Sequence, residues 1–598
     1  MMVKIAIIYK DIEFIRNLEE TLHNRIKETI DLDLSVELLL EEFHEKYVFP
    51  RDCDEFLLLC SVDTDVDFSK IPEGCIIIPI SQKGKNVEST GSNLQKINAF
   101  EYDDKNHSVS VDTLCDIILD KLGIIKNSRK IFISYKRSET KRLAEMVRKE
   151  LSDAGYTVFL DTRDIDVGSD FMQEIRQSIV ESDIFLMLNS ESYYDSLYTK
   201  KELYAACISG ASIVVLSSRN TRNEELNGLD FVKIDEYNGK SKKRRLSKKD
   251  RDSIFNKIGL VRLQLWKKRH QRLNRHIESF QERDVFLQGV YVPSKSSIDH
   301  SSIYAITGLP DTMDFQRIQQ HGIRSYNRKQ KKEQSKKLYA LFDDLTLPAS
   351  YTKHLKWLDK EMPNINLIKT SSFEQDISKI TKYTDEMNNR QPIVFLSASI
   401  PNEDDDDYNY LKIHDMIVTL TETVIKRGGT LVFGGHPTIT PIILNIMEIM
   451  AENNYEGVKD YPNIYLYQSK FFENMFPPET MAFPEKRLER VPVVAVNDDR
   501  LVQSEKELKE KQLSLDLMRE RMIEAFPYTS AFFIGGRYKG KGVESSGVWD
   551  EYVKFTNKHP DTKCFYIENT GIVPLKLYEH FGGDKFEKIL VEDIPSKL

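Results

Sequence analysis

The sequence predicts a multidomain α/β protein built from mostly parallel sheets. The chain has 598 residues, which is too long for one hydrophobic core and indicates three or four domains of ordinary size. Short apolar runs rich in Val, Ile and Leu alternate with helical stretches along most of it, as in parallel sheets covered by helices. The sequence repeats no motif at a fixed short period, so we do not expect a solenoid.

Residues 1–125 form the first predicted domain. Its strand-like runs are VKIAIIY, SVELLL, EFLLLCSV and GCIIIPI, and they alternate with helical stretches such as IRNLEETLHNRIKETI. The sequence of this segment contains neither a phosphate loop nor a catalytic cluster. We therefore expect a small flavodoxin-like or receiver-like α/β domain that serves in interaction.

Residues 128–235 form the second predicted domain. The buried strand RKIFISY is followed by the helix KRLAEMVRKELSDAG, which is expected to end at Gly155. The strand YTVFLD, the loop TRDIDVGSD, the helix FMQEIRQSIVES and the strand DIFLMLNS come next. One further helix leads into the strand ASIVVLSS, which completes a compact parallel α/β domain.

Residues 236–390 have a different character. They contain the basic runs KSKKRRLSKKDR and RKQKKEQSKK and a long amphipathic stretch, KIGLVRLQLWKKRHQRLNRHIESF. Basic runs can contact nucleic acid, but a solvated, basic and partly helical connector explains them better.

Residues 391–598 form the last predicted domain, again of α/β type. The strand PIVFLSASI is followed by an acidic loop and a helix that Gly428 and Gly429 are expected to end. The strand TLVFGG, the helix PIILNIMEIMAEN, the strand TSAFFIGG and the helix VWDEYVKFTNKH continue the alternation.

Composition excludes several classes of protein. The net charge of −9 argues against a general nucleic-acid binder, which needs a basic excess to release counterions. The six cysteines form no C-x-x-C pair, and no His, Cys, Asp or Glu cluster has metal-ligand spacing, so we expect no disulfide framework and no metal site. No apolar stretch approaches the roughly 20 residues that span a bilayer, and MMVKIAIIY is expected to be a strand rather than a signal peptide. We expect a cytoplasmic protein without a membrane partner.

The second domain resembles the TIR domain family in three boxes. The first is KIFISYKRSE, and the second is FLDTRDIDVGSDFMQEI, in which Val167 stands where the family usually has proline. The third, LNSESYYDSLYTKKEL, is similar to the family pattern S-x-x-[FY]-x-x-S-x-W-C-x-x-E, with Tyr198 in place of Trp and Thr199 in place of Cys. The resemblance implies a flavodoxin-like fold. It also implies that Glu202 stands where the NAD-cleaving members of the family keep their catalytic glutamate.

A single carboxylate suffices for the chemistry that this resemblance implies. Ordinary glycosidases need two, because one must protonate the leaving oxygen. Nicotinamide leaves from a pyridinium that is already positively charged, so it needs no proton and no metal. The remaining task is to stabilise positive charge developing on the ribose, which an ionised Glu202 performs electrostatically.

The other expected NAD contacts come from the family resemblance. They lie at the end of the first strand, where open α/β sheets bind ligands, in the loop after the second strand, and one turn before Glu202. Arg137 is suited to pair with a phosphate. The expected NAD-binding residues are Ser134, Tyr135, Lys136, Arg137, Asp164, Gly168 and Tyr198.

The last domain resembles the SLOG superfamily, which includes phosphoribohydrolases and nucleotide-binding sensors. LSASI, RGGTLVFGGHPTIT, FFIGG and SSGVWDEY carry the resemblance. The last two are similar to the enzyme signature P-G-G-x-G-T-x-x-E, but the insertion RYKGKGVESS separates them and Val548 replaces the Thr. The resemblance therefore implies a Rossmann-like domain that binds a nucleotide rather than a working hydrolase.

Glycine-rich loops at predicted helix starts support a phosphate or ribose site in this domain. Thr440 followed by Pro441 is a strong helix start, and the preceding glycines let backbone N–H groups face an anion. Ser545 or Ser546 similarly begins the helix that contains Glu551. The expected nucleotide-binding residues are Ser397, Ser399, Gly434, Gly435, His436, Thr440, Gly535, Gly536, Arg537, Ser546, Gly547 and Glu551.

A TIR domain joined to a SLOG domain is similar to the architecture of bacterial anti-phage effectors. This resemblance implies a NAD+ glycohydrolase, with NAD+ as substrate and no cofactor. A signalling nucleotide, either a cyclic nucleotide or an ADP-ribose derivative, would activate it through assembly into a homo-oligomer. Two alternatives stay open. The TIR domain would make a cyclised ADP-ribose signal, or it would be a non-enzymatic scaffold in which Glu202 is solvated.

Overall fold

The computed structural model describes two compact units: residues 1–128, 269–343 and 353–383 form the first, and residues 129–268, 344–352 and 384–598 form the second. Within them, the described residues are 2–8, 12–29, 37–42, 55–62, 67, 71, 75–82, 94, 97, 99–103, 107–122, 129–160, 171–190, 192–218, 230–234, 246–281, 302–316, 318–319, 338–347, 351–373, 375–376, 391–401, 410–452, 463–475, 487–497, 500, 502–538 and 542–598.

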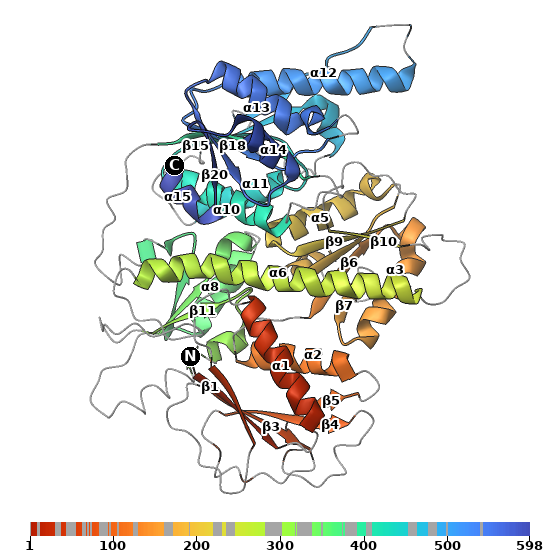
Figure 1. Cartoon of the computed structure of the whole chain (residues 1–598), viewed down its shortest axis with the longest axis vertical. Coiled ribbons are helices and arrows are strands. Elements are labelled where there is room, and N and C mark those ends of the chain that lie inside the picture. The colour runs from red at the N-terminus through yellow and green to blue at the C-terminus, as the bar shows by residue number, and fades with distance from the viewer. Residues whose placement is uncertain are drawn as a thin grey trace. The chain divides into compact units, whose positions relative to one another are not determined.

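The N-terminal sheet belongs to the first unit and has the strand order β2-β1-β3-β4-β5 with parallel neighbours (Figure 1). This is the order of flavodoxin-like sheets. The short strand β5 is an addition to the predicted elements. The elements are β1 Met2–Ile8, α1 Ile12–Thr29, β2 Glu37–Glu42, β3 Glu55–Ser61, β4 Ile76–Gln82, β5 Phe100–Tyr102 and α2 His107–Lys121.

Residues 236–390 contain more regular structure than the predicted connector. The amphipathic stretch forms one long helix, α6 (Lys248–Gln281), but Arg262, Lys268 and Arg272 on it are buried, so this helix is not a solvated connector. A small parallel sheet of order β11-β12-β13 follows, and it was not among the predicted elements. Its elements are β11 Ser302–Ile306, β12 Leu338–Phe342, α8 Thr352–Glu361 and β13 Ile365–Lys369.

The second sheet belongs to the second unit and has the order β10-β9-β8-β6-β7, again with parallel neighbours. Side chains of α3 and α6 cover one face, and those of α4 and α5 cover the other, so the central strands are continuous apolar runs. Strand β10 is an addition to the predicted strands. The elements are β6 Lys130–Tyr135, α3 Arg137–Asp153, β7 Thr157–Leu160, α4 Phe171–Val180, β8 Ile184–Leu188, the 3₁₀ turn η5 Tyr193–Asp195, α5 Leu197–Ser209, β9 Ser212–Ser218 and β10 Asp230–Ile234.

The C-terminal sheet has the order β17-β16-β15-β14-β18-β19-β20, in which the chain reverses direction across the sheet between β14 and β18, as in Rossmann-like folds. Gly428, with φ +62°, ends α10 as predicted, and α11 begins at Thr440 as predicted. The elements are β14 Ile393–Ala398, α10 Tyr410–Lys426, β15 Thr430–Gly434, α11 Thr440–Glu452, β16 Asn463–Ser469, β17 Leu488–Val491, α12 Gln503–Glu524, β18 Ser530–Ile534, α13 Gly547–Lys558, β19 Lys563–Ile567, α14 Ile572–Phe581, β20 Phe586–Ile589 and α15 Ile594–Lys597.

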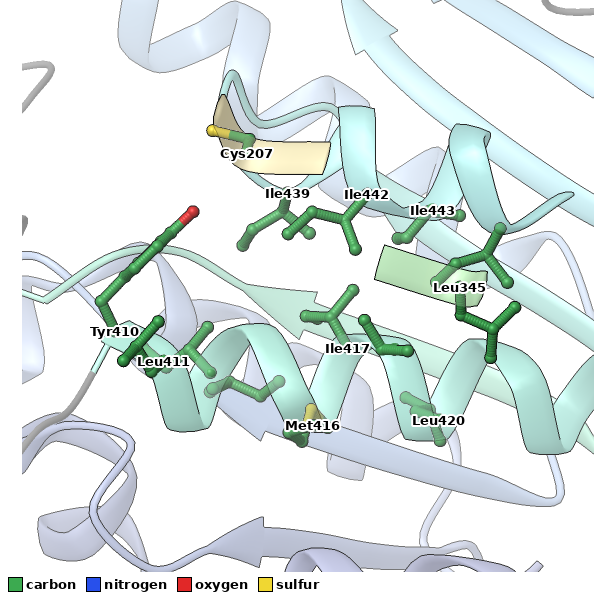
Figure 2. Packing of buried hydrophobic residues seen from close by; sticks show 14 of the residues in the cluster. Cys207, Leu345, Tyr410, Leu411, Met416, Ile417, Leu420, Ile439, Ile442 and Ile443 are labelled. Carbon is green, nitrogen blue, oxygen red and sulfur yellow. The ribbon is translucent and has the colours of Figure 1, made fainter. Parts of the chain in front are cut away.

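One apolar cluster connects the second sheet to the C-terminal sheet. It runs from the second sheet through α4 and α5 to α10 and α11 and then to β14 and β15. Figure 2 shows the part of it between α10 and α11, with Cys207 of α5 beside them. A separate cluster fills the other face of the C-terminal sheet beneath α12, α13 and α14. Among the described residues, no helix combines the length and apolar character needed to cross a membrane.

Candidate functional site

Helix α5 places Glu202 inside the domain rather than on a wet helix face. Ser196 caps the start of the helix, where its Oγ accepts a hydrogen bond from the Thr199 amide at 3.5 Å. Gly210 ends the helix in the left-handed conformation, with φ +61°. The Glu202 side chain between these two caps is only 2% exposed. A carboxylate at this depth is costly unless hydrogen bonds satisfy it.

Two buried hydroxyl groups satisfy part of that requirement. Ser134, near the end of β6, donates to Oε2 of Glu202 at 2.5 Å, and its Oγ lies 2.5 Å from the hydroxyl of Tyr193. A serine has one hydroxyl proton, so the Tyr193 hydroxyl donates to Ser134 while Ser134 donates to Glu202. Hydrogen bonds to a carboxylate are the stronger kind, so this chain of donors fixes the position of Glu202.

The cluster of Ser134, Tyr193 and Glu202 lies where the order of the second sheet reverses. Strands β6 and β8 are neighbours there, and open α/β sheets bind ligands outside the carboxyl ends of such strands. The turn η5 carries Tyr193, and Thr199 holds that turn because its Oγ1 donates to the Tyr193 carbonyl at 2.5 Å.

A charged rim borders this cluster. Lys136 donates from Nζ to the carbonyl and hydroxyl oxygens of Ser192, at 2.9 and 2.6 Å, and Ser192 also donates to Glu139. Burial would raise the pKa of Glu139, but hydrogen bonds from Ser190 and Ser192 and the charge of Lys136 hold that pKa below its ordinary value. The lowered pKa keeps Glu139 ionised, and the contacts of Lys136 and Glu139 with Ser192 tie the end of β6 to η5.

The C-terminal sheet reverses its order between β14 and β18, and its loops at that edge approach closely. Gly535 has φ +64°, and a Cβ there would lie 1.6 Å from the carbonyl oxygen of Ser399. Only glycine fits this position, so the β18 loop contacts the β14 loop through bare backbone. Ser397 Oγ is buried at the same edge, without a hydrogen-bond partner among the described residues.

The loop after β15 presents a neutral imidazole. The Thr440 hydroxyl accepts from the His436 amide at 2.9 Å, and the Thr438 amide points at Nδ1 of His436 from 3.3 Å. Because an amide only donates, Nδ1 accepts and Nε2 carries the proton as a donor. Burial, and secondarily the charge of Arg537, lowers the pKa of His436 to about 3.

Helix starts add further donors to this edge. The described part of α11 begins at Thr440, and Ser546 caps α13, where its Oγ accepts from the Val548 amide at 3.3 Å. This edge therefore offers N–H donors from two helix N-termini and from the neutral imidazole, together with the positive charge of Arg537. Such a set of groups is suited to bind an anionic ligand such as a phosphate.

Two family models match the chain. Residues 131–247 match the model described as TIR domain, and residues 405–595 match the model described as SLOG cluster3 family. The chain is a TIR–SLOG protein. No curated protein matches it.

The predicted NAD-binding residues of the TIR domain lie in several different places. Ser134 is beneath Glu202, Tyr135 is buried in the core, and Lys136 holds Ser192. Arg137 is exposed at the start of α3, and Tyr198 is 58% exposed on α5. Asp164 and Gly168 lie outside the described residues.

The predicted nucleotide-binding residues of the SLOG domain lie mainly at one sheet edge. They lie near the ends of β14 and β15, in the loops after β14, β15 and β18, or at the starts of α11 and α13. Glu551 is engaged differently, because it accepts from Nε of Arg519 at 2.9 Å, inside a cluster that includes Asp516 and Asp550. The carboxylate of Glu551 is therefore committed to an internal ion pair.

Tyr193 and Thr438 were not among the predicted site residues. Tyr193 occupies the aromatic position of the third TIR box, so its position in the motif could have indicated a site residue. The contact of its hydroxyl with Ser134 could be seen only in the folded structure. Among the described residues, no group of three or more His, Cys, Asp or Glu side chains has a metal-binding arrangement.

Proposed function

We propose that the TIR domain hydrolyses NAD+ to nicotinamide and ADP-ribose, and that a phosphate-bearing nucleotide at the SLOG sheet edge controls this reaction. The observation that carries the proposal is the Glu202 carboxylate, held by Ser134 and Tyr193 at the order reversal of the TIR sheet. The TIR family match supports the substrate class, and the SLOG match supports the class of signal.

The reaction needs one charged group at the sugar. The bond between the ribose C1′ and the nicotinamide nitrogen breaks, and its electron pair leaves with nicotinamide, which becomes neutral. The positive charge that develops on the ribose is stabilised by Glu202, an already oriented anion. Water then attacks C1′ and loses a proton, so the products are ADP-ribose, nicotinamide and H+.

The burial of Glu202 supports control of this activity. At 2% exposure the carboxylate is closed to a substrate as large as NAD+, so the described conformation is a resting one. Uncontrolled NAD+ cleavage would kill the host cell. Release only upon a nucleotide signal fits a role in anti-phage defence by NAD+ depletion, with the active state assembled from several chains.

The test is chromatography of NAD+ incubated with the full chain, with and without ADP-ribose or a panel of cyclic nucleotides. In reactions without added ADP-ribose, nicotinamide and ADP-ribose are expected in equal amounts. A cyclised product in place of ADP-ribose would mean that a hydroxyl or ring nitrogen of the substrate, rather than water, attacks C1′. No nicotinamide from concentrated protein under any of these conditions would reject NAD+ cleavage. Because the departing pyridinium needs no Lewis acid, we expect EDTA to leave the rate unchanged.

A further inference from the structure

Helix α5, which carries Glu202, packs directly against helices of the SLOG domain. The shared apolar cluster passes from Phe132 of the TIR sheet through Ala206 of α5 to Ile442 of α11 without a break. In Figure 2, Ile417 of α10 points toward α11, and Cys207 of α5 lies at the end where α10 begins. Close-packed interiors are hard to compress, so a displacement of α10 or α11 reaches α5.

A polar contact from the SLOG domain caps the C-terminal end of α5. His414 of α10 is fully buried, with Nε2 3.1 Å from the Cys207 carbonyl oxygen and Nδ1 2.6 Å from Nζ of Lys268. An ammonium group only donates, so Nδ1 accepts and Nε2 donates to the carbonyl. The last carbonyls of a helix have no partner within it and favour a nearby cation. We call His414 and Lys268 the interdomain cap.

Gly210 makes this approach possible. A Cβ at Gly210 would lie 3.0 Å from Cε1 of His414 and 3.3 Å from Nζ of Lys268. Its φ of +61° also suits glycine better than other residues. The end of α5 and the interdomain cap are therefore fitted to each other in the described conformation.

The helices that hold α5 begin at the SLOG sheet edge. Strand β14 ends at Ala398, and the next helix in the chain, α10, begins at Tyr410 and carries His414 one turn later. Helix α11 begins at Thr440, which holds the His436 loop. A phosphate bound beside His436 would therefore lie at the start of α11, which packs against α5 in the shared apolar cluster.

We propose that the interdomain cap holds α5 in the resting position, and that a phosphate-bearing ligand at the SLOG edge releases it. Ligand binding shifts the starts of α10 and α11, which separates His414 from the Cys207 carbonyl. The freed end of α5 then moves, and the buried site that contains Glu202 and Ser134 becomes open to NAD+. This inference rests on the proposed function, because it describes the regulation of the same site.

The test uses the full chain with the double substitution His414→Leu and Lys268→Met. The double substitution removes the donor and the acceptor together, and an apolar pair of similar volume is well tolerated in place of a buried polar pair. We expect unstimulated nicotinamide release, and amide hydrogen exchange at residues 206–210, to rise on the order of tenfold, the effect of one buried hydrogen bond.

Two control variants separate the cap from general loosening of α10. His414→Gln keeps a donor and an acceptor and should behave like the wild type. Thr423→Val removes a hydrogen bond within α10, from Oγ1 to the Thr419 carbonyl, and should not change α5. If the double variant does not fold, Lys268→Met alone should raise both readouts about threefold, since it leaves His414 in place.

The outcomes separate this proposal from the proposed function. Unchanged exchange at residues 206–210, or a fall in unstimulated release, in a folded double variant would overturn the cap. If amide exchange at residues 206–210 becomes faster but neither the variants nor the wild type release nicotinamide, NAD+ cleavage is rejected. The contact between the interdomain cap and the end of α5 would still be supported.

Discussion

The TIR site (Ser134, Tyr193 and Glu202) and the SLOG site (Ser397, His436, Gly535 and Arg537) occupy the same topological position in their sheets. Each lies at the carboxyl ends of the two strands between which the strand order reverses, β6 and β8 in one sheet and β14 and β18 in the other. Their chemistry is opposite. The TIR site holds a buried carboxylate with hydroxyl donors, whereas the SLOG site offers helix N-termini, a guanidinium and a neutral imidazole.

The difference indicates that sheet topology sets where each candidate site lies, while a few side chains set the charge that each site is suited to bind. A carboxylate suits the positive charge of a breaking nicotinamide bond, and N–H donors suit a phosphate. The two sites also differ in access, because Glu202 is closed off and the SLOG site consists of loops and helix starts. Substitutions that reverse or remove one charge in either site test this difference in charge preference.

The largest expected effect follows from Glu202→Gln, which removes the charge and nearly conserves the volume. Nicotinamide release should fall on the order of a hundredfold to a thousandfold, because about 3–4 kcal/mol of transition-state stabilisation is lost. The melting temperature should stay near that of the wild type, since glutamine still accepts from Ser134. Glu145→Gln on α3 is the matched control. Near wild-type turnover in folded Glu202→Gln protein would reject its catalytic role.

Charge reversal in the SLOG site should abolish the response to nucleotide. A ligand at 100 times its Kd stabilises the folded domain by about 2.7 kcal/mol and so raises its melting temperature by several degrees. Arg537→Glu should remove both this shift and ligand-dependent NAD+ loss, while unstimulated release is unchanged. Calorimetry with the activating nucleotide measures the shift, and Lys576→Glu on α14 is the control. A full response in Arg537→Glu would place the signal site elsewhere.

Acid should destabilise the SLOG domain through His436. Its pKa is about 3 in the folded domain, whereas a histidine in an unfolded chain has its ordinary pKa of about 6.5. Between these values the unfolded chain binds a proton that the folded domain does not, so stability falls as the pH drops below about 6.5. The loss at pH 5 is about 2 kcal/mol.

His436→Gln isolates this contribution from those of the carboxylates. Calorimetry of both full chains between pH 7.5 and 5 should show a smaller loss of stability in the variant, by about 2 kcal/mol. Parallel pH dependence in the two proteins would mean that His436 is protonated equally in the folded and unfolded states.

The strands at the two order reversals were directly predictable, whereas β16, β17, β19 and β20 of the C-terminal sheet were not among the predicted elements. Strands β6, β8, β14 and β18 are buried on both faces and form continuous apolar runs, which the sequence displays directly. Strands β17 and β20 are short and partly exposed, so LERV and FEKI resemble loop sequence.

The sequence could indicate single residues of the TIR site, but it could not indicate which of these residues contact one another. Spacing identified Glu202, but Ser134 is 68 positions away from it, and their hydrogen bond depends on how α5 packs on the sheet. The cap on α5 is still more remote, because His414 and Cys207 are 207 positions apart in two domains. Asp164 and Gly168 stay predictions.

The smallest expected effect distinguishes two roles for Ser134. The family resemblance implies a contact with NAD+, whereas the structure places its hydroxyl beneath Glu202, where it is fully buried. If Ser134 positions the carboxylate, Ser134→Ala should lower kcat about tenfold and leave KM nearly unchanged, because one hydrogen bond to a charged group is lost. Tyr193→Phe should cost less, about threefold, since Tyr193 acts on Glu202 through Ser134. Steady-state kinetics of both variants at saturating nucleotide measures this difference. A raised KM at constant kcat in Ser134→Ala would instead place the hydroxyl on bound NAD+.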